Sequence, residues 1–168
     1  SGLSYENDQY TASMRIIADH IRAIVMIAGD NAGIKPSNKD QGYVLRRLIR
    51  RMIRHAKKLN IDVFGEWDKE LANIIIEQYR GYYSEIEKNK GVILEVIAAE
   101  KIKFNRTLEK GLKEFEKVAQ RSENKVINKE EAFRLYDTFG FPIELTVELA
   151  KELDLEVDVE GFNKKFQE

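Results

Sequence analysis

One helix-length segment, residues 43–59, constrains the fold of this chain more than any other, because it carries two opposed surfaces. Its apolar side chains recur at the i, i+3, i+4, i+7 spacing of a single helical face. They are Leu45, Leu48, Ile49, Met52, Ile53, Ala56 and Leu59. An apolar face of this kind predicts a helix that packs on a core.

Cations fill the opposite arc of the same segment, with His55 at the border and no acidic residue among them. The cations are Arg46, Arg47, Arg50, Arg51, Arg54, Lys57 and Lys58. Surface helices normally mix charge signs, because opposite charges one turn apart attract and like charges repel. The net charge of the whole chain is only −1, so this basic character is local and indicates an anionic partner.

Three kinds of partner suit such a face. Nucleic-acid phosphates match the planar, bidentate guanidinium group. Acidic side chains elsewhere in the chain, such as Glu85–Glu87 or Glu130–Glu131, are the second alternative, and they would pair with the face internally. An anionic membrane surface is the third. The charge pattern favours nucleic acid and leaves the other two open.

The composition argues against several kinds of functional site. The 168 residues include no cysteine and only two distant histidines, His20 and His55, which suits structural side chains better than metal ligands. No phosphate loop or nucleophile motif is present, and no apolar run is long enough to span a bilayer. We therefore expect no catalytic residue, no metal site, no cofactor and no membrane partner in this chain. The opening Ser1-Gly2 and the helical pattern at the end suggest a piece of a longer protein.

Helical periodicity along the chain predicts an all-α, bundle-like domain of two packed helical subdomains, residues 1–85 and 86–168. Thr11 or Ser13 is expected to begin the first helix, which runs to about Ala28. The other expected helices are 43–59, 67–83, 85–121 with a break near Asn89, 128–140, 142–153 and 159 to the end. No segment shows the alternation of a strand. Gly111, inside the long helix, has no explanation at this level.

Two small polar residues stand out against this helical background. Asn38 lies on a loop of turn-forming residues directly before the basic helix, and loops often carry binding residues. Asp137 falls in the last turn of a predicted helix, where the helix dipole disfavours a carboxylate. The alternatives are that Asn38 is an ordinary turn residue and that Asp137 makes a local hydrogen bond to Thr138 or to a neighbouring turn.

Three stretches together resemble one family, alanyl-tRNA synthetase, in the region that recognises tRNA. They follow the family order, and the resemblance covers essentially the whole chain. The stretches are residues 15–23, residues 36–38 with 42–51, and residues 132–146. The chain departs from the family at Gln41, where an arginine is usual, and at Phe139, where a tyrosine is common.

The resemblance implies a class II alanine–tRNA ligase of the cytoplasm as the parent, acting on ATP, L-alanine and tRNA(Ala). ATP, Mg and Zn are then expected only in its catalytic and editing domains, outside this chain. Asn38 and Asp137 would come together and read a G·U pair of the acceptor stem from the minor groove, while the seven cations hold the RNA backbone. The alternative from another class is a helical protein-interaction domain whose basic face docks an acidic partner.

Overall fold

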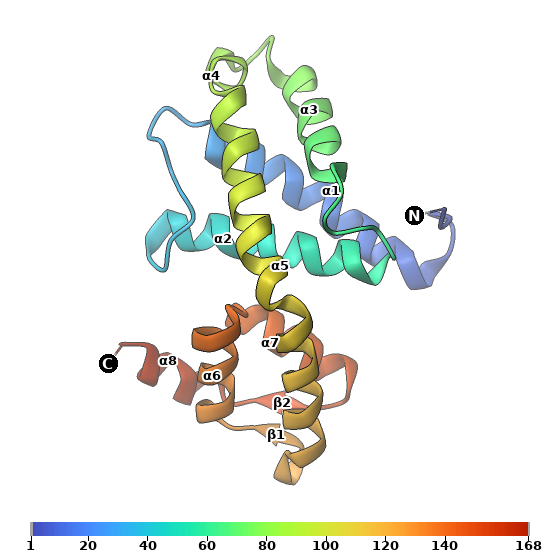
Figure 1. Ribbon diagram of the computed structural model, residues 1–168, viewed down its shortest axis with the longest axis vertical. Coiled ribbons are helices and arrows are strands. Elements are labelled where there is room, and N and C mark those ends of the chain that lie inside the picture. Colours follow the sequence, from blue (N-terminus) through green and yellow to red (C-terminus); the bar gives the residue numbers. More distant parts are fainter. Residues whose placement is uncertain (1, 168) are drawn as a thin grey trace. The chain divides into compact units, whose positions relative to one another are not determined.

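The computed structural model describes residues 2–167, and its elements are almost all helices (Figure 1). The helices are α1 (Asp8–Gly29), α2 (Asp40–Lys58), α3 (Trp67–Tyr79), α4 (Ser84–Lys88), α5 (Lys90–Arg121), the short η1 (Glu123–Lys125), α6 (Lys129–Phe139), α7 (Ile143–Glu152) and α8 (Val159–Gln167). The predicted all-α class is confirmed. Two strands that the sequence did not predict, β1 (Val126–Ile127) and β2 (Glu156–Val157), pair in parallel. With two residues each, they are too short to show a strand period.

The contacts divide the chain into two compact units, Ser1–Lys103 and Phe104–Glu168, and the boundary falls within α5. The first half of α5 belongs to the first unit, where Ile93 and Ile97 are fully buried. The predicted division into helical subdomains at residue 85 stays a prediction.

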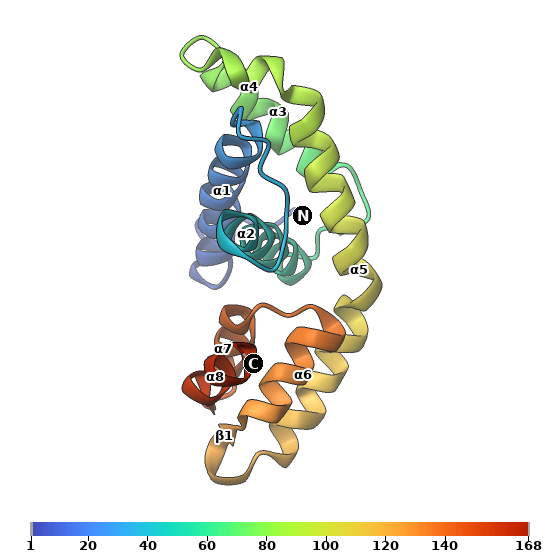
Figure 2. The ribbon, with the colours of Figure 1, turned by 90° about the vertical axis from the view of Figure 1, so that its left-hand side faces the viewer.

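In the first unit, α1 packs on α2, and α3 and α4 pack on α1 (Figures 1 and 2). The apolar face predicted for α2 is buried in this core, except for Leu48, which stays partly exposed. Each fully buried aliphatic side chain contributes about 1.5–3 kcal/mol relative to an exposed one. The same burial therefore fixes which way the basic arc of α2 points.

The start of α1 differs from the prediction, because its N-cap is Asn7 and neither Thr11 nor Ser13. The Asn7 side chain accepts a hydrogen bond from the backbone N–H of Gln9 at 3.0 Å. Thr11 lies inside the helix and donates its hydroxyl hydrogen to the carbonyl of Asn7 at 3.0 Å. Ser13 is buried, with its hydroxyl 3.0 Å from Nδ1 of His55. Both hydroxyls are thus used inside the helix, as helical Ser and Thr often are.

The break expected near Asn89 is confirmed, since α4 ends at Lys88 and α5 begins at Lys90. The Asn89 side-chain amide donates to the carbonyl oxygen of Gly29 at 2.8 Å and to Oδ1 of Asn31 at 3.2 Å. The break is therefore the point at which the chain is tied to the end of α1.

In the second unit, α8 and α7 pack on α6 (Figure 2). The short strand β2 contacts α7. Asn128 caps α6 as predicted, because its Oδ1 accepts from the backbone N–H of Glu131 at 2.9 Å. The helix ends before Gly140, whose φ of 71° lies in the left-handed region that favours glycine. Pro142 then precedes the first turn of α7. Sequence signals thus set both ends of the helix that carries Asp137.

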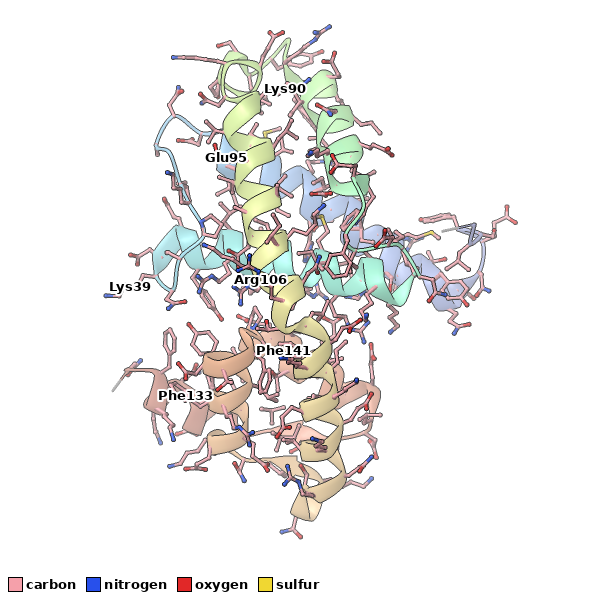
Figure 3. All side chains as sticks on the ribbon, in the orientation of Figure 1. Lys39, Lys90, Glu95, Arg106, Phe133 and Phe141 are labelled. Carbon is pink, nitrogen blue, oxygen red and sulfur yellow. The ribbon has the colours of Figure 1, made fainter. Side chains whose placement is uncertain are left out.

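Gly111 on α5 is explained by its contact with the turn after α6. A Cβ at this position would lie 2.5 Å from Cε1 of Phe141 and 3.0 Å from Cβ of Phe139. Phe141, which is labelled in Figure 3, is fully buried. Its ring packs edge-on against Phe104, with ring centroids 5.8 Å apart. Only a residue without a side chain lets the turn approach this closely.

Candidate functional site

The basic face of α2 is not a uniform stripe in solvent. Arg50 and Arg54 are buried, at 7% and 8% exposure. Arg46, Arg47, Arg51 and Lys57 are partly exposed, and Lys58 is exposed. The face therefore combines cations that serve the interior with cations that reach the surface.

A buried acid on α5 receives the guanidinium group of Arg50. Glu100 is 2% exposed, and its Oε1 accepts from Arg50 Nε at 2.6 Å and pairs with Nη2 at 2.5 Å. One turn earlier on α2, Arg46 places its Nε 3.6 Å from the same oxygen. Removing a charge from water costs several kcal/mol, so a buried carboxylate requires such partners. Part of the basic face thus pairs internally, and the acid that Arg50 and Arg46 meet is Glu100, which lies outside the predicted runs Glu85–Glu87 and Glu130–Glu131.

The sequence contained a signal for Glu100 that our interpretation missed. The apolar seam of α5 includes Ile97 and Phe104, and Glu100 lies between them at i+3 and i−4 spacing. A carboxylate on the buried face of a helix needs a cation on the element packed against it. That cation is on α2, the most basic helix of the chain.

The next residue of α5 also carries a buried charge. Lys101 pairs with Asp68 on α3 at 2.5 Å and donates to the carbonyl oxygen of Gly65 at 2.7 Å. Asp68 is fully buried and Lys101 is 6% exposed. The first unit therefore buries two ion pairs side by side, one from α5 to α2 and one from α5 to α3.

His20 on α1 is a structural partner of the basic face, as expected for a satisfied histidine. Nη1 of Arg51 lies 3.0 Å from its Nε2, and Asp19 lies 3.3 Å from its Nδ1. Burial, and next the nearby charge of Arg51, lower the pKa of His20 below its ordinary value, although Asp19 opposes them. A neutral ring with Nε2 as the acceptor fits a guanidinium that can only donate.

The loop that carries Asn38 is held against the start of α2. The backbone N–H of Ser37 donates to the carbonyl of Gly42 at 3.0 Å, and the Ser37 hydroxyl donates to the carbonyl of Lys39 at 2.9 Å. A Cβ at Gly42 would lie 2.3 Å from Ser37 Oγ, so a glycine is needed there. Asn38 itself is exposed, and its Oδ1 accepts a hydrogen bond from Nη1 of Arg46.

Asp137 lies in the last turn of α6 and is exposed. Within the described chain its carboxylate has no hydrogen-bond or ion-pair partner, so the alternative of a local bond to Thr138 is wrong. Arg134, one turn earlier, pairs with Oε1 of Glu114 on α5 at 3.2 Å. The carboxylate is thus available to a ligand. Asn38 and Asp137 belong to different units, and their joint position at one base pair stays a prediction.

The aromatic side chains of α3 and of the turn after it differ in their exposure. α3 ends at Tyr79, four residues before its predicted end. Tyr82 is 85% exposed, whereas Tyr83 is partly covered by Tyr79, with ring centroids 6.3 Å apart. Trp67 is half-buried. Among these four rings Tyr82 and Tyr83 are exposed, at 85% and 47%, and Tyr82 is the more accessible to a stacking base.

Gln41, which replaces the usual arginine of the resembling family, lines a shallow depression of about 300 Å³. The depression is mostly apolar and lies between the end of α1, the loop and the start of α2. Its other lining residues are Met26, Ile27, Asp30, Ile34 and Val44. Lys39, two residues before Gln41, is exposed (Figure 3), so a cation still stands at this end of α2.

Two properties of the described residues bear on other kinds of site. No helix within residues 2–167 has the length and apolar character that a membrane crossing demands. Over the same range, no three His, Asp or Glu side chains gather closely enough to hold a metal ion.

Comparisons with known proteins agree on one family. Residues 1–168 match the family described as tRNA synthetases class II (A). The chain is 47% identical to an alanine–tRNA ligase of Treponema pallidum over 161 residues, which cover 94% of this chain and 26% of the relative. It is 42% identical over 169 residues to the alanine–tRNA ligase of Thermotoga maritima, covering 100% of this chain and 19% of the relative. The chain thus spans a fifth to a quarter of the length of these relatives.

Proposed function

The chain belongs to the tRNA synthetases class II (A) family, and on this premise we propose that it recognises the acceptor stem of tRNA(Ala) within an alanine–tRNA ligase. The parent would join L-alanine to tRNA(Ala) with ATP in the cytoplasm. We assign ATP, Mg²⁺ and Zn²⁺ to the catalytic and editing domains of that parent, outside this chain. The task of this chain is then to bind RNA.

The observation that carries the proposal is the exposed, unpartnered carboxylate of Asp137. In a G·U wobble pair the guanine N2 amino group keeps an unpaired N–H in the minor groove. An ionised carboxylate is a pure acceptor and suits that donor. A-form RNA exposes a wide, shallow minor groove, so a short side chain on a helix can reach the base edge. We propose that Asp137 reads this group and that Asn38 reads the same pair.

The remaining surface cations would grip the RNA backbone without reading its sequence. Burial assigns Arg50 and Arg54 to the fold in this proposal, although both lie on the same helical arc. The grip then falls to the surface-reaching cations of α2 and of the loop before it. They include Lys39, Arg47, Arg51, Lys57 and Lys58, whereas Arg46, also partly exposed, contacts Glu100 and Asn38.

A binding experiment with two hairpins tests the assignment of Asp137. The hairpins carry the acceptor stem with either a G·U or a G·C pair at the recognised position. We expect wild type to prefer G·U by about 1–3 kcal/mol and Asp137→Asn to lose that preference. Glu130 lies two turns earlier on the same face of α6, so Glu130→Gln removes an equal charge and should keep the preference.

Retention of the full G·U preference by Asp137→Asn would show that another group reads the pair. If the chain bound neither hairpin at low salt, the alternative of an acidic protein partner would gain. Arg47→Ala should weaken both hairpins alike and reduce the slope of log K against log salt concentration by about one.

A further inference from the structure

We propose that Glu100 is a positioning residue for base-pair reading, because it holds Arg46 and Arg46 in turn holds Asn38. This inference rests on the proposed function, since it concerns how Asn38 is presented to RNA. Glu100 is 62 positions away from Asn38 in the sequence and is buried, so it cannot touch RNA itself.

We call the contacts from Glu100 through Arg46 to Asn38 the relay. Its first step lies between α5 and α2. Oε1 of Glu100 makes two short contacts with the Arg50 guanidinium, at 2.6 Å and 2.5 Å. Arg50 is therefore the main counter-charge that keeps the carboxylate in place. Arg46 is the same oxygen's third contact, an ion pair at 3.6 Å between Oε1 and Nε. The side chain of Arg46 is 20% exposed, so solvent screens this pair only in part.

The second step passes from Arg46 to the loop. A guanidinium group is planar, and its Nε and Nη1 lie at fixed positions relative to each other. The Nε of Arg46 lies 3.6 Å from Glu100 as an ion pair without a hydrogen bond, and this attraction limits where Nη1 can lie. That Nη1 donates to Oδ1 of Asn38. The loop backbone supports the same position, because Gly42 allows Ser37 to lie directly on the start of α2.

This relay fixes the chemical sense in which Asn38 reads its ligand. A side-chain amide offers an acceptor and two donors, and its two ends differ little in shape. Arginine can only donate, so the acceptor end of Asn38 faces Arg46 and the Nδ2 donors remain for a ligand. Asn38 would then read an acceptor atom of the minor groove, while Asp137 reads a donor. The two side chains would therefore make complementary demands on the base pair.

The relay is tested first without RNA, by the side-chain amide of Asn38 in nitrogen-15 relaxation measurements on the 168-residue chain. We expect a rigid amide in wild type and a mobile amide in Glu100→Gln. Arg46→Lys is the second variant, because a lysine keeps the charge but has one nitrogen and cannot serve both partners. It should also release Asn38, and it avoids leaving Arg50 buried without its carboxylate.

Asp68→Asn is the matched control. It breaks the neighbouring buried pair with Lys101, on the next residue of α5, and has no link to Asn38. We expect it to lower the melting temperature and to leave the Asn38 amide rigid. In hairpin binding, Arg46→Lys should reduce the G·U over G·C preference about fivefold, whereas Asp68→Asn should not change it.

The outcomes separate the relay from the function. A rigid Asn38 amide in both Glu100→Gln and Arg46→Lys overturns the relay, whatever the RNA result. A mobile Asn38 amide in both variants supports the relay. If wild type then showed no preference for the G·U hairpin, the proposed function would be overturned while the relay would stand. An Asn38 amide that is equally mobile in Asp68→Asn also overturns the relay, because general loosening of the unit would then explain the motion.

Discussion

Asn38 and Asp137, the two candidate reading residues, are held in opposite ways. Asn38 stands on a loop, and its acceptor oxygen is engaged by Arg46, which is paired with the buried Glu100. Asp137 stands on a helix, and its carboxylate has no partner among the residues described. A residue on a loop needs contacts from a rigid element to fix its direction, whereas a helical residue takes its direction from the backbone.

A helical residue needs instead that its neighbours be occupied elsewhere. Arg134 lies three residues before Asp137, at a distance along the helix where opposite charges normally pair. Glu114 on α5 forms an ion pair with Arg134, and it also pairs with Lys117 and Arg121 of its own helix. In the function that we propose, Glu100 would hold a reading residue in place, whereas Glu114 would keep a competing cation away from the other.

The largest expected effect is on the free energy of unfolding, and it should differ between these two acids because only Glu100 is buried with its main partner. Glu100→Ala leaves Arg50 buried without a counter-charge and should lower the free energy of unfolding by about 3–5 kcal/mol. Glu114→Ala removes a carboxylate whose partners are exposed, and it should cost less than about 1 kcal/mol. Urea unfolding followed by circular dichroism measures both. Similar losses in the two variants would break the comparison.

The next effect tests how firmly the end of α6 is set. Gly111→Ala places a methyl group against Phe139 and Phe141, which lie two and four residues after Asp137, and should destabilise the chain by about 1–3 kcal/mol. Gly91 is the matched control on the same helix, because a Cβ there meets nothing within 4 Å. Gly91 lies in the first turn of α5, so Gly91→Ala should stabilise by less than the roughly 0.5–1 kcal/mol expected in the middle of a helix. Thermal unfolding measures whether each variant raises or lowers the melting temperature. An unchanged melting temperature in Gly111→Ala would mean that the turn after α6 can shift to make room.

A third effect concerns pH and is confined to the first unit, since both histidines precede residue 104. The folded state lowers the pKa of His20, so the unfolded state binds the proton more tightly. The contribution of His20 to the free energy of unfolding should therefore be fully present above the ordinary pKa of 6.5. It should fall as the pH drops from there towards the lowered pKa. Each unit of lowering is worth about 1.4 kcal/mol. His20→Gln should have a flatter stability profile between pH 7 and pH 5, and an unchanged slope would contradict the assignment.

The smallest effect sharpens the role of Glu114. Glu114→Gln should release Arg134, which can then pair with Asp137 one turn along the helix at a gain of about 0.3–0.5 kcal/mol. Because this internal pair competes with RNA, binding of the G·U hairpin should weaken about twofold. The double variant with Arg134→Gln should restore it. If Glu114→Gln bound the hairpin as tightly as wild type, Arg134 would not be the competitor.

Local signals in the sequence predicted a large part of the fold. The apolar face of α2, the cap at Asn128, the stop at Gly140 and the break at Asn89 all depend on residues close in the chain, and all are confirmed. The misses depend on distant contacts. Gly111 is explained only by Phe141, thirty residues later, and β1 forms only because β2 reaches it.

The candidate site shows the same division. The pattern placed Asn38 before the basic helix and Asp137 at a helix end, and both are exposed there. The pattern grouped Arg50 with the surface cations because a helical arc does not show what packs against it. Arg50 faces α5, and the acid that it meets is fifty residues away in the sequence. Helical periodicity gives the direction of a side chain on its own helix, and tertiary packing decides whether that direction leads to water.

The adjacent buried charges of α5 have a consequence for how that helix is oriented. Consecutive residues of an α-helix differ by about 100° around the axis, so Glu100 and Lys101 face two different neighbours. An apolar surface tolerates a small rotation of a helix, because Ile and Leu fill similar space. Opposite charges do not, since turning α5 by one residue would present Lys101 to the arginines of α2. The two ion pairs together therefore fix the rotational orientation of this part of α5 about its own axis.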